Sequence, residues 1–123
     1  MKQLSTDQII RLHSQLISAS GGTDGVRNLG LVDSAVTNVF ETYFGVEQYP
    51  TIEEKAARLC YSLVKNHGFI DGNKRIGVFA MLILLEINGT VLDCTDEELV
   101  RLGVRVASSK LGYEDILEFI MNH

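Results

Sequence analysis

The feature that most constrains the fold is a helix-start pattern that occurs three times in 123 residues. A serine or threonine is followed three positions later by a glutamine or glutamate, the spacing of a capping box, in which each side chain accepts a hydrogen bond from the other residue's backbone amide. Apolar residues follow each pair at intervals of three and four, as on one face of a helix. We therefore expect helices to begin at three pairs: Ser5 with Gln8, Thr51 with Glu54, and Thr95 with Glu98.

Helical spacing of apolar residues is also found in three other segments, which are Leu31–Phe40, Asn73–Ile87 and Tyr113–Ile120. The stretch Val78–Leu85 is apolar on every side, which is typical of a helix at the centre of a bundle. Between the second and third helices, Gly45 to Pro50 is predicted to be a break. The sequence as a whole predicts one all-α domain of about six helices over residues 1–123.

The composition narrows the class of function. Eleven lysines and arginines against sixteen aspartates and glutamates give a net charge of −5, which does not favour a direct nucleic-acid or membrane partner. Two cysteines, Cys60 and Cys94, are too few for a disulfide framework or a metal cluster, and they suit a reducing compartment. No apolar run is long enough to span a bilayer, and no signal-peptide pattern follows Met1. We expect a cytoplasmic protein.

The residues with the most reactive side chains are concentrated in one segment, His67 to Arg75, which joins the two central helices. The N-terminus of the second of these helices would bind an anion, and Gly72 would let a phosphate approach its backbone closely. Lys74 and Arg75 add two positive charges there. Asp71 could hold Mg²⁺, and a histidine such as His67 can accept a proton near neutral pH. This combination is typical of phosphoryl or nucleotidyl transfer.

Each of these residues also has an ordinary structural explanation. Asp71, Gly72 and Asn73 all favour turns, and His67 continues the apolar stripe of its helix and could be packed. The basic pair favours the functional interpretation, because two cations at a helix N-terminus oppose the helix dipole unless an anion is present. His13 lies on the core face of the first predicted helix, so we interpret it as a structural histidine.

The segment His67–Arg75 resembles the signature of the Fic/Doc (Fido) superfamily, and specifically of its Doc branch, the death-on-curing toxins. Similarity elsewhere extends this resemblance over nearly the whole chain, in Gly21–Asn28, Tyr49–Thr51, Glu54–Ala57 and Asn88–Gly89. The resemblance implies the Fido fold, with the active-site loop between two central helices. It also implies the site residues: His67 as general base, Asp71 as Mg²⁺ ligand, Phe69 as the anchor of the loop, and Gly72, Asn73, Lys74 and Arg75 as the residues that hold the phosphates of ATP.

Two positions depart from the pattern of Fic enzymes that transfer AMP. Lys74 stands where those enzymes have glycine, and Val78 stands where they have a second arginine. The resemblance to Doc toxins instead implies a protein kinase that transfers the γ-phosphate of ATP to a hydroxyl, by family resemblance a threonine of elongation factor Tu, and so arrests translation. AMP transfer and a catalytically inactive binding module are the alternatives. A ribonuclease is disfavoured by the acidic net charge.

The resemblance also implies that the protein is inhibited by a partner. Many Fic enzymes carry an inhibitory helix whose glutamate pairs with the arginine of the signature. The nearest string here, Thr37–Thr42, departs from that pattern at its last position and falls in a predicted core helix. We therefore expect a type II toxin–antitoxin system, in which a separate antitoxin folds a disordered segment onto the toxin.

Overall fold

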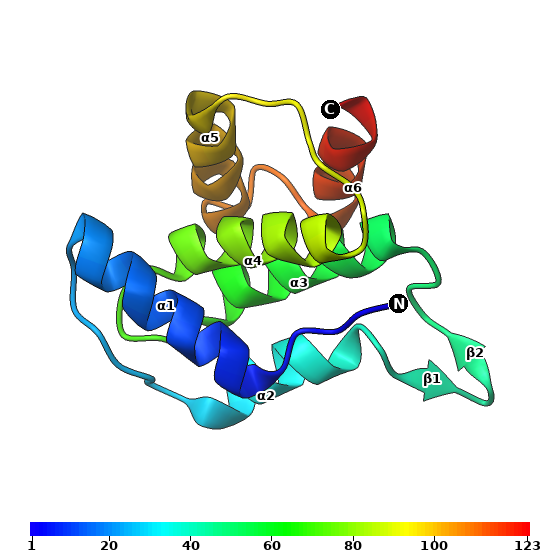
Figure 1. Cartoon of the computed structure of the whole chain (residues 1–123), viewed down its shortest axis with the longest axis horizontal. Coiled ribbons are helices and arrows are strands. Elements are labelled where there is room, and N and C mark those ends of the chain that lie inside the picture. Colours follow the sequence, from blue (N-terminus) through cyan, green and yellow to red (C-terminus); the bar gives the residue numbers. More distant parts are fainter.

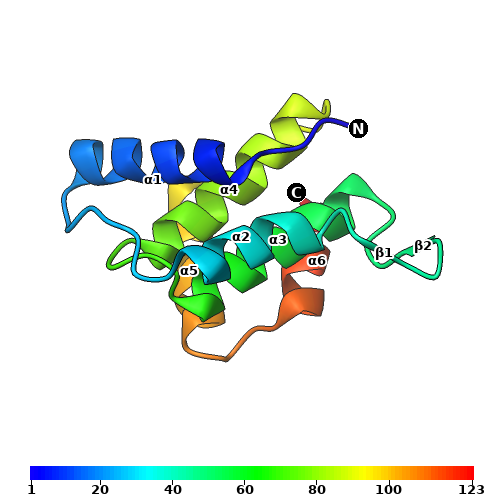
Figure 2. The ribbon, with the colours of Figure 1, turned by 90° about the horizontal axis from the view of Figure 1, so that it is seen from below.

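The computed structural model describes all residues from 1 to 123, and six helices make up most of it. The helices are α1 (Thr6–Ser20), α2 (Leu29–Asn38), α3 (Ile52–Asn66), α4 (Asn73–Ile87), α5 (Asp96–Ala107) and α6 (Tyr113–Asn122). Helices α3 and α4 lie side by side at the centre, α1 and α2 cover one side of this pair, and α5 and α6 cover the other (Figures 1 and 2). The predicted all-α fold is confirmed.

All three predicted capping boxes are present. At the start of α1 the Gln8 amide donates to Ser5 Oγ at 3.1 Å, and the Ser5 amide donates to Gln8 Oε1 at 2.8 Å. Thr51 and Thr95 make the same reciprocal bonds at the starts of α3 and α5. Because both partners of each bond lie within one turn, these helix starts depend on local sequence alone.

The central position predicted for α4 is also confirmed. Its side chains Ile76, Met81, Leu84 and Leu85 are fully buried, and they belong to the same core as the apolar face of α3. Beyond α4 the chain turns at Asn88 and Gly89, where Gly89 has a φ of 91° that favours glycine. No helix combines the length and the apolar character that crossing a membrane requires.

A small hairpin lies between α2 and α3. It begins at Thr42, before the predicted break Gly45–Pro50, and extends into that break. Strands β1 (Thr42–Tyr43) and β2 (Val46–Glu47) pair antiparallel through a two-residue turn. Phe44 and Gly45 form that turn with φ values of 53° and 77°, the signs that a type I′ turn requires. The prediction missed the hairpin because each strand has only two residues, which is too short to show an alternation of apolar and polar residues.

A buried lysine holds the hairpin against the bundle. Lys55 of α3 is 1% exposed, and its ammonium donates to Glu47 Oε1 at 3.0 Å and to the Val39 carbonyl at 3.1 Å, as well as to the Tyr49 carbonyl. Val39 follows the last turn of α2. This helix ends two residues earlier than predicted, and its start, which Asn28 caps, is also two residues earlier. Lys55 therefore ties together the end of α2, the hairpin and α3.

Candidate active site

The segment His67–Arg75 comprises the connection between α3 and α4, residues 67–72, and the first three residues of α4. Helix α3 ends at His67, which adopts the left-handed conformation with a φ of 52°. This turn takes the His67 ring off the apolar stripe of α3, so the expectation that His67 continues the stripe is wrong. The ring is exposed and forms no hydrogen bond with the protein. An exposed imidazole at a helix end is free to meet a substrate from solvent.

Phe69 and Asn73 fix the middle of this loop. The Phe69 side chain is 1% exposed, and its ring stacks on the ring of His13 with 3.8 Å between centroids. Asn73 Oδ1 accepts a hydrogen bond from the Phe69 amide at 3.1 Å, and Asn73 Nδ2 donates to the Phe69 carbonyl at 3.0 Å. The side-chain amide of Asn73 is thus occupied by the loop backbone. The group of Asn73 that can still face a phosphate is its backbone N–H.

Helix α4 begins without a side-chain cap. Gly72 is its N-cap residue, in the left-handed conformation with a φ of 77°. The backbone N–H groups of Asn73, Lys74 and Arg75 precede the first helical hydrogen bond, and none of them has an acceptor in the protein. Three unpaired donors at the positive end of a helix dipole favour the binding of an anion.

The Asp71 carboxylate lies at this helix start. Its Oδ2 accepts a hydrogen bond from the Thr23 amide at 3.1 Å, and its Oδ1 accepts one from the Gly72 amide at 2.8 Å. These two backbone donors, first Thr23 and then Gly72, hold the pKa of the Asp71 carboxyl below its ordinary value, and the Arg75 guanidinium adds to the effect. Asp71 is therefore ionised at neutral pH, and its side chain is 46% exposed.

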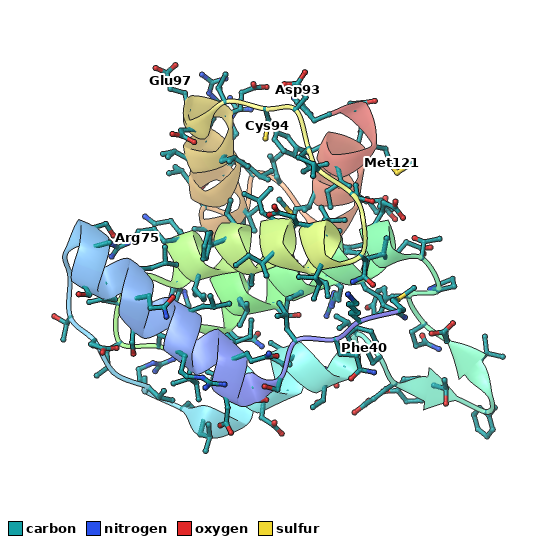
Figure 3. The ribbon with its side chains drawn as sticks, in the orientation of Figure 1. Phe40, Arg75, Asp93, Cys94, Glu97 and Met121 are labelled. Carbon is teal, nitrogen blue, oxygen red and sulfur yellow. The ribbon has the colours of Figure 1, made fainter.

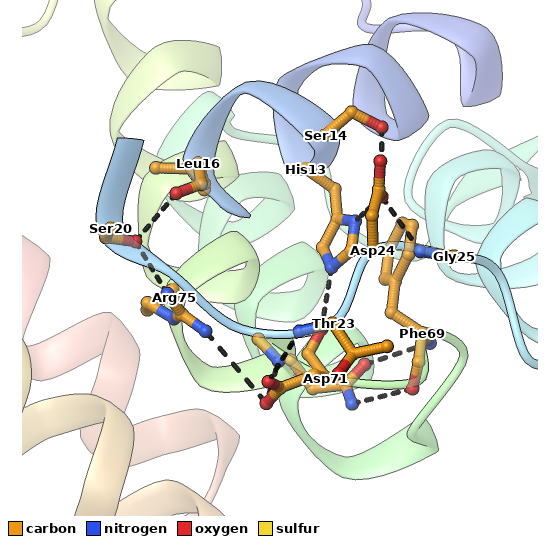
Figure 4. Close-up of polar contacts among 12 residues, drawn as sticks. His13, Ser14, Leu16, Ser20, Thr23, Asp24, Gly25, Phe69, Asp71 and Arg75 are labelled. Carbon is orange, nitrogen blue, oxygen red and sulfur yellow. Dashed lines mark hydrogen bonds and ion pairs between the residues drawn. The ribbon is translucent and has the colours of Figure 1, made fainter. Parts of the chain in front are cut away.

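Arg75 is held by the end of α1. Its Nη1 donates to Ser20 Oγ at 2.6 Å and to the Gly21 carbonyl at 2.7 Å, while its Nη2 lies 3.9 Å from Asp71 Oδ1 (Figures 3 and 4). The guanidinium is thereby fixed beside the start of α4 with its side chain still 37% exposed. Lys74 is exposed and forms no hydrogen bond or ion pair with the protein.

The segment between α1 and α2 packs against the loop. Its Gly25 carbonyl accepts a hydrogen bond from the Ile70 amide, and the Arg27 amide donates to the Gly68 carbonyl, so Val26 and Phe69 form an isolated antiparallel bridge. The side chain of Arg27 also donates to the His67 carbonyl at 2.7 Å. This segment therefore lies directly beside His67.

A pocket of about 440 Å³ opens over these groups. His67, Ile70 and the whole run from Asp71 to Arg75 line it, and Ala107 at the end of α5 contributes to its far side. Val78 lies outside the pocket lining: it is 8% exposed and packs against α5 at Gly103. A larger hollow of about 650 Å³ runs along α5, but no histidine lines it, and the acidic residues Asp96 and Glu97 stand at the start of α5 there.

The loop and nearly all of the first four helices match a known protein family. The profile of the Fic/DOC family matches residues 3–85. The chain belongs to the Fic/DOC family. Within this family the resemblance to the Doc branch is confirmed by two curated relatives.

The first relative is Toxin Doc of Mycolicibacterium smegmatis, which is 46% identical to this chain over 74 residues. That alignment covers 60% of this chain and 57% of the mycolicibacterial protein. The second is Protein kinase doc of Escherichia phage P1, which is 27% identical over 119 residues, 96% of this chain and 92% of the phage protein. The chain thus aligns with little more than half of one Fic/DOC relative and with nearly all of the other.

Three contributors to this Fic/DOC site were not predicted from the sequence. Thr23 donates its amide to Asp71, Ser20 accepts from Arg75, and His13 bonds the backbone of Asp71. Thr23 acts through its backbone amide, which nearly every residue has, and Ser20 acts through a hydroxyl that other small residues also carry. No sequence signal therefore marks these two residues. His13 was correctly expected to be buried and hydrogen-bonded, but its partner could not be deduced from helix spacing.

Proposed function

We propose that this protein is a Doc-type toxin that transfers the γ-phosphate of ATP to a hydroxyl of a target protein, by family resemblance a threonine of elongation factor Tu. The observation that carries the proposal is the uncapped start of α4, where three unpaired amides, Lys74 and Arg75 converge beside the free imidazole of His67. The name of the phage relative, a protein kinase, supports the same reaction class.

In this proposal the phosphates of ATP lie over the start of α4. The amides of Asn73 and Lys74 donate to phosphate oxygens, and the side chains of Lys74 and Arg75 add charge-assisted hydrogen bonds. Such fixed donors stabilise the charge of the transition state without reorganisation. Arg75 is prepared for this role by its bonds to Ser20 and Gly21, which set the guanidinium beside the pocket.

His67 acts on the acceptor. A ring nitrogen of His67 takes the proton of the target hydroxyl as the hydroxyl oxygen bonds to the γ-phosphorus. The bond from that phosphorus to the β,γ-bridging oxygen breaks, and ADP leaves. The exposure of the His67 ring supports this role, because the acceptor is a large protein that must reach the ring from solvent.

The site fits a Mg²⁺ ion held jointly with ATP. No group of three metal-ligating side chains exists in the structure. Mg²⁺ in phosphotransferases commonly takes only one or two carboxylates, with phosphate oxygens and water completing the octahedron. Asp71 supplies one ionised, half-exposed carboxylate at the pocket, and each of its oxygens keeps a free lone pair beside its backbone hydrogen bond. When bound, Mg²⁺ neutralises charge on the phosphates.

Two features favour γ-phosphate transfer over AMP transfer. Lys74 extends from α4 into the region that a glycine would leave open, and no residue of the structure pairs with it. Val78, at the position where the AMP-transferring pattern has an arginine, is buried against α5 and offers no charge to a terminal phosphate.

Isotope position in ATP tests the reaction. The purified protein is incubated with elongation factor Tu, Mg²⁺ and ATP labelled at either the α or the γ position. We expect label on the factor from γ-labelled ATP only, with a mass gain of one phosphoryl group on a threonine. Label from α-labelled ATP would instead establish AMP transfer. If neither label reaches any protein of a cell lysate, the binding-module alternative is correct.

Two variants serve as controls in this assay. His67→Ala should abolish transfer, whereas Met121→Ala should leave it unchanged. Met121 is 67% exposed on α6, remote from Arg75 (Figure 3). Equal loss of transfer in both variants would point to a general defect of the preparation.

We also propose that a separate antitoxin inhibits the protein, since one relative is named Toxin Doc and the string nearest to an inhibitory helix does not form one. Thr37–Thr42 runs from the end of α2 into β1, so the expectation that it falls in a core helix is wrong. A disordered segment that folds on binding suits a switch that proteolysis can reset. Co-expression with the product of the adjacent gene should yield a complex without transferase activity. If the adjacent product neither binds nor inhibits, this part of the proposal is wrong.

A further inference from the structure

His13 lies directly behind the active-site loop. It belongs to α1, its side chain is 1% exposed, and it meets the loop at two places. Its Nε2 is 2.6 Å from the backbone oxygen of Asp71, and its ring stacks on the Phe69 ring at 3.8 Å with an interplanar angle of 15° (Figure 4). One buried side chain thus contacts both the anchor of the loop and the residue that carries the site carboxylate.

The hydrogen bond to Asp71 has a defined direction. A carbonyl oxygen only accepts, so His13 Nε2 carries the proton of this bond. The Asp71 carboxylate is bonded independently by the amides of Thr23 and Gly72. The backbone oxygen on one side and the carboxylate on the other are therefore both fixed, and these bonds set the orientation of the peptide between Asp71 and Gly72.

That peptide determines where the anion-binding amides point. Gly72 is the N-cap of α4, and a methyl group placed on it would come within 3.4 Å of His13 Nε2. The Gly72 carbonyl accepts the first helical hydrogen bond, from Ile76 at 2.9 Å. Rotation of the Asp71–Gly72 peptide would therefore tilt the first turn of α4 and the free amides of Asn73, Lys74 and Arg75.

The far side of the His13 ring faces a carboxylate. Asp24 Oδ1 lies 3.5 Å from His13 Nδ1 and accepts hydrogen bonds from Ser14 Oγ at 3.1 Å and from the Gly25 amide at 2.8 Å (Figure 4). The bond from Nε2 to the Asp71 carbonyl orients the ring, and Asp24 lies at its Nδ1 edge. The contacts run from Asp24 through His13 to Asp71.

We propose that His13 is a positioning residue for phosphate transfer: its Nε2–H holds the Asp71 carbonyl so that the amides of α4 and the Asp71 carboxylate face the pocket. His13 touches no substrate in this arrangement. The inference rests on the proposed function for its kinetic consequence, but its structural consequence can be measured in the free protein.

Three variants separate the hydrogen bond from packing. His13→Phe keeps a flat ring against Phe69 but loses the donor. His13→Gln keeps an N–H donor at a similar distance from the backbone. Ile9→Val, one turn earlier on α1 and fully buried in the core, makes a small cavity there and serves as the control for lost stability.

Amide hydrogen exchange gives the readout that is independent of activity. We expect exchange at Gly72 and Ile76 to accelerate at least about 10-fold in His13→Phe, relative to an Ile9→Val protein of similar stability, and to return close to the wild-type rate in His13→Gln. Unchanged exchange at both amides in His13→Phe would overturn the proposal, whether or not the protein transfers phosphate.

Kinetics then test the catalytic consequence. In His13→Phe we expect kcat to fall at least about 10-fold with little change in KM for the acceptor protein, because a misplaced group slows chemistry more than it weakens remote binding. His13→Gln should recover most of the kcat. Equal kcat losses in the two variants would show a merely structural role. If the wild-type protein transfers no label at all, the proposed function fails, and exchange alone decides the role of His13.

Discussion

Asn73 holds Phe69 by both of its backbone groups, accepting from the amide at 3.1 Å and donating to the carbonyl at 3.0 Å. The family resemblance implies that Asn73 holds phosphate, but its side chain instead closes the active-site loop by bonding the Phe69 backbone. Its side chain and the buried Phe69 ring together make the loop a rigid base for His67 and Asp71.

Removal of the Asn73 side-chain amide should lower the stability of the protein. We expect Asn73→Ala to reduce the free energy of unfolding by about 1–3 kcal/mol, since two partly buried backbone groups of Phe69 lose their partners. Asn73→Asp keeps the acceptor and adds a negative charge at a helix start, so its loss should be smaller. Urea denaturation of the three proteins checks this order, and equal losses in Ala and Asp variants would contradict it.

Loss of the His67 ring should affect activity without affecting the fold. We expect His67→Ala to lower kcat by at least about 100-fold while the melting temperature stays unchanged, because the exposed ring makes no hydrogen bond within the protein. Circular dichroism and the phosphate-transfer assay measure the two effects. A variant that still modifies its target at the wild-type rate would remove His67 from the mechanism.

A methyl group at Gly22 should damage the site. Gly22 has a φ of 115°, and a Cβ there would lie 2.5 Å from Asp71 Oδ2 and 2.9 Å from Arg75 Nη2. We expect Gly22→Ala to lose both stability and transferase activity. Gly89→Ala is the matched control, with a φ of 91° and open space around it; it should lose only about 1 kcal/mol of stability from backbone strain. Full activity of Gly22→Ala would argue that Asp71 and Arg75 tolerate displacement.

Lys55 should be among the most sensitive positions outside the site. Lys55→Met leaves the carbonyls of Val39 and Tyr49 without their donor, so we expect a loss of about 2–4 kcal/mol. Glu47→Gln removes only the half-exposed partner and should lose less than about 1 kcal/mol. The comparison is made by chemical denaturation, and a larger effect of Glu47→Gln would show that the ion pair outweighs the carbonyl contacts.

The pair His123–Glu98 should make stability depend on pH. Both ring nitrogens of His123 face acceptors, the Phe119 carbonyl and Glu98 Oε2, each at 2.7 Å. The bond to Phe119 and then that to Glu98 raise the pKa of His123, while the Thr95 amide and then His123 lower the pKa of Glu98. The charged pair therefore forms fully between the ordinary values, 4.5 for Glu98 and 6.5 for His123.

The sign of this dependence differs at the two ends of that range. As pH rises through the raised pKa of His123 the contribution of the histidine is lost, and as pH falls through the lowered pKa of Glu98 the contribution of the glutamate is lost. We expect the difference in melting temperature between wild type and His123→Ala to be largest from about pH 5 to 6.5 and to shrink above it. A difference independent of pH would show that His123 acts through its stacking on Phe119 instead.

Local sequence determined much of this protein. The three capping boxes, the six helices and the place of the loop between two central helices follow from spacings of three and four residues. The chemistry of the loop could also be anticipated, because a basic pair at a helix start is explained by an anion. In each of these features the interacting residues lie within one or two helical turns of each other. They can therefore be predicted from the order of residues along the chain.

Only the tertiary structure decided which distant groups meet. The bonds from His13 to Asp71 and from Arg75 to Ser20 join residues 58 and 55 positions apart, and the bond from Thr23 to Asp71 uses a backbone amide that every residue but proline has. Lys55 is buried because three carbonyl or carboxylate oxygens from the end of α2, the hairpin and the chain after it converge on it. Such contacts depend on how helices pack, and periodicity along one helix carries no information about the partner that will face it.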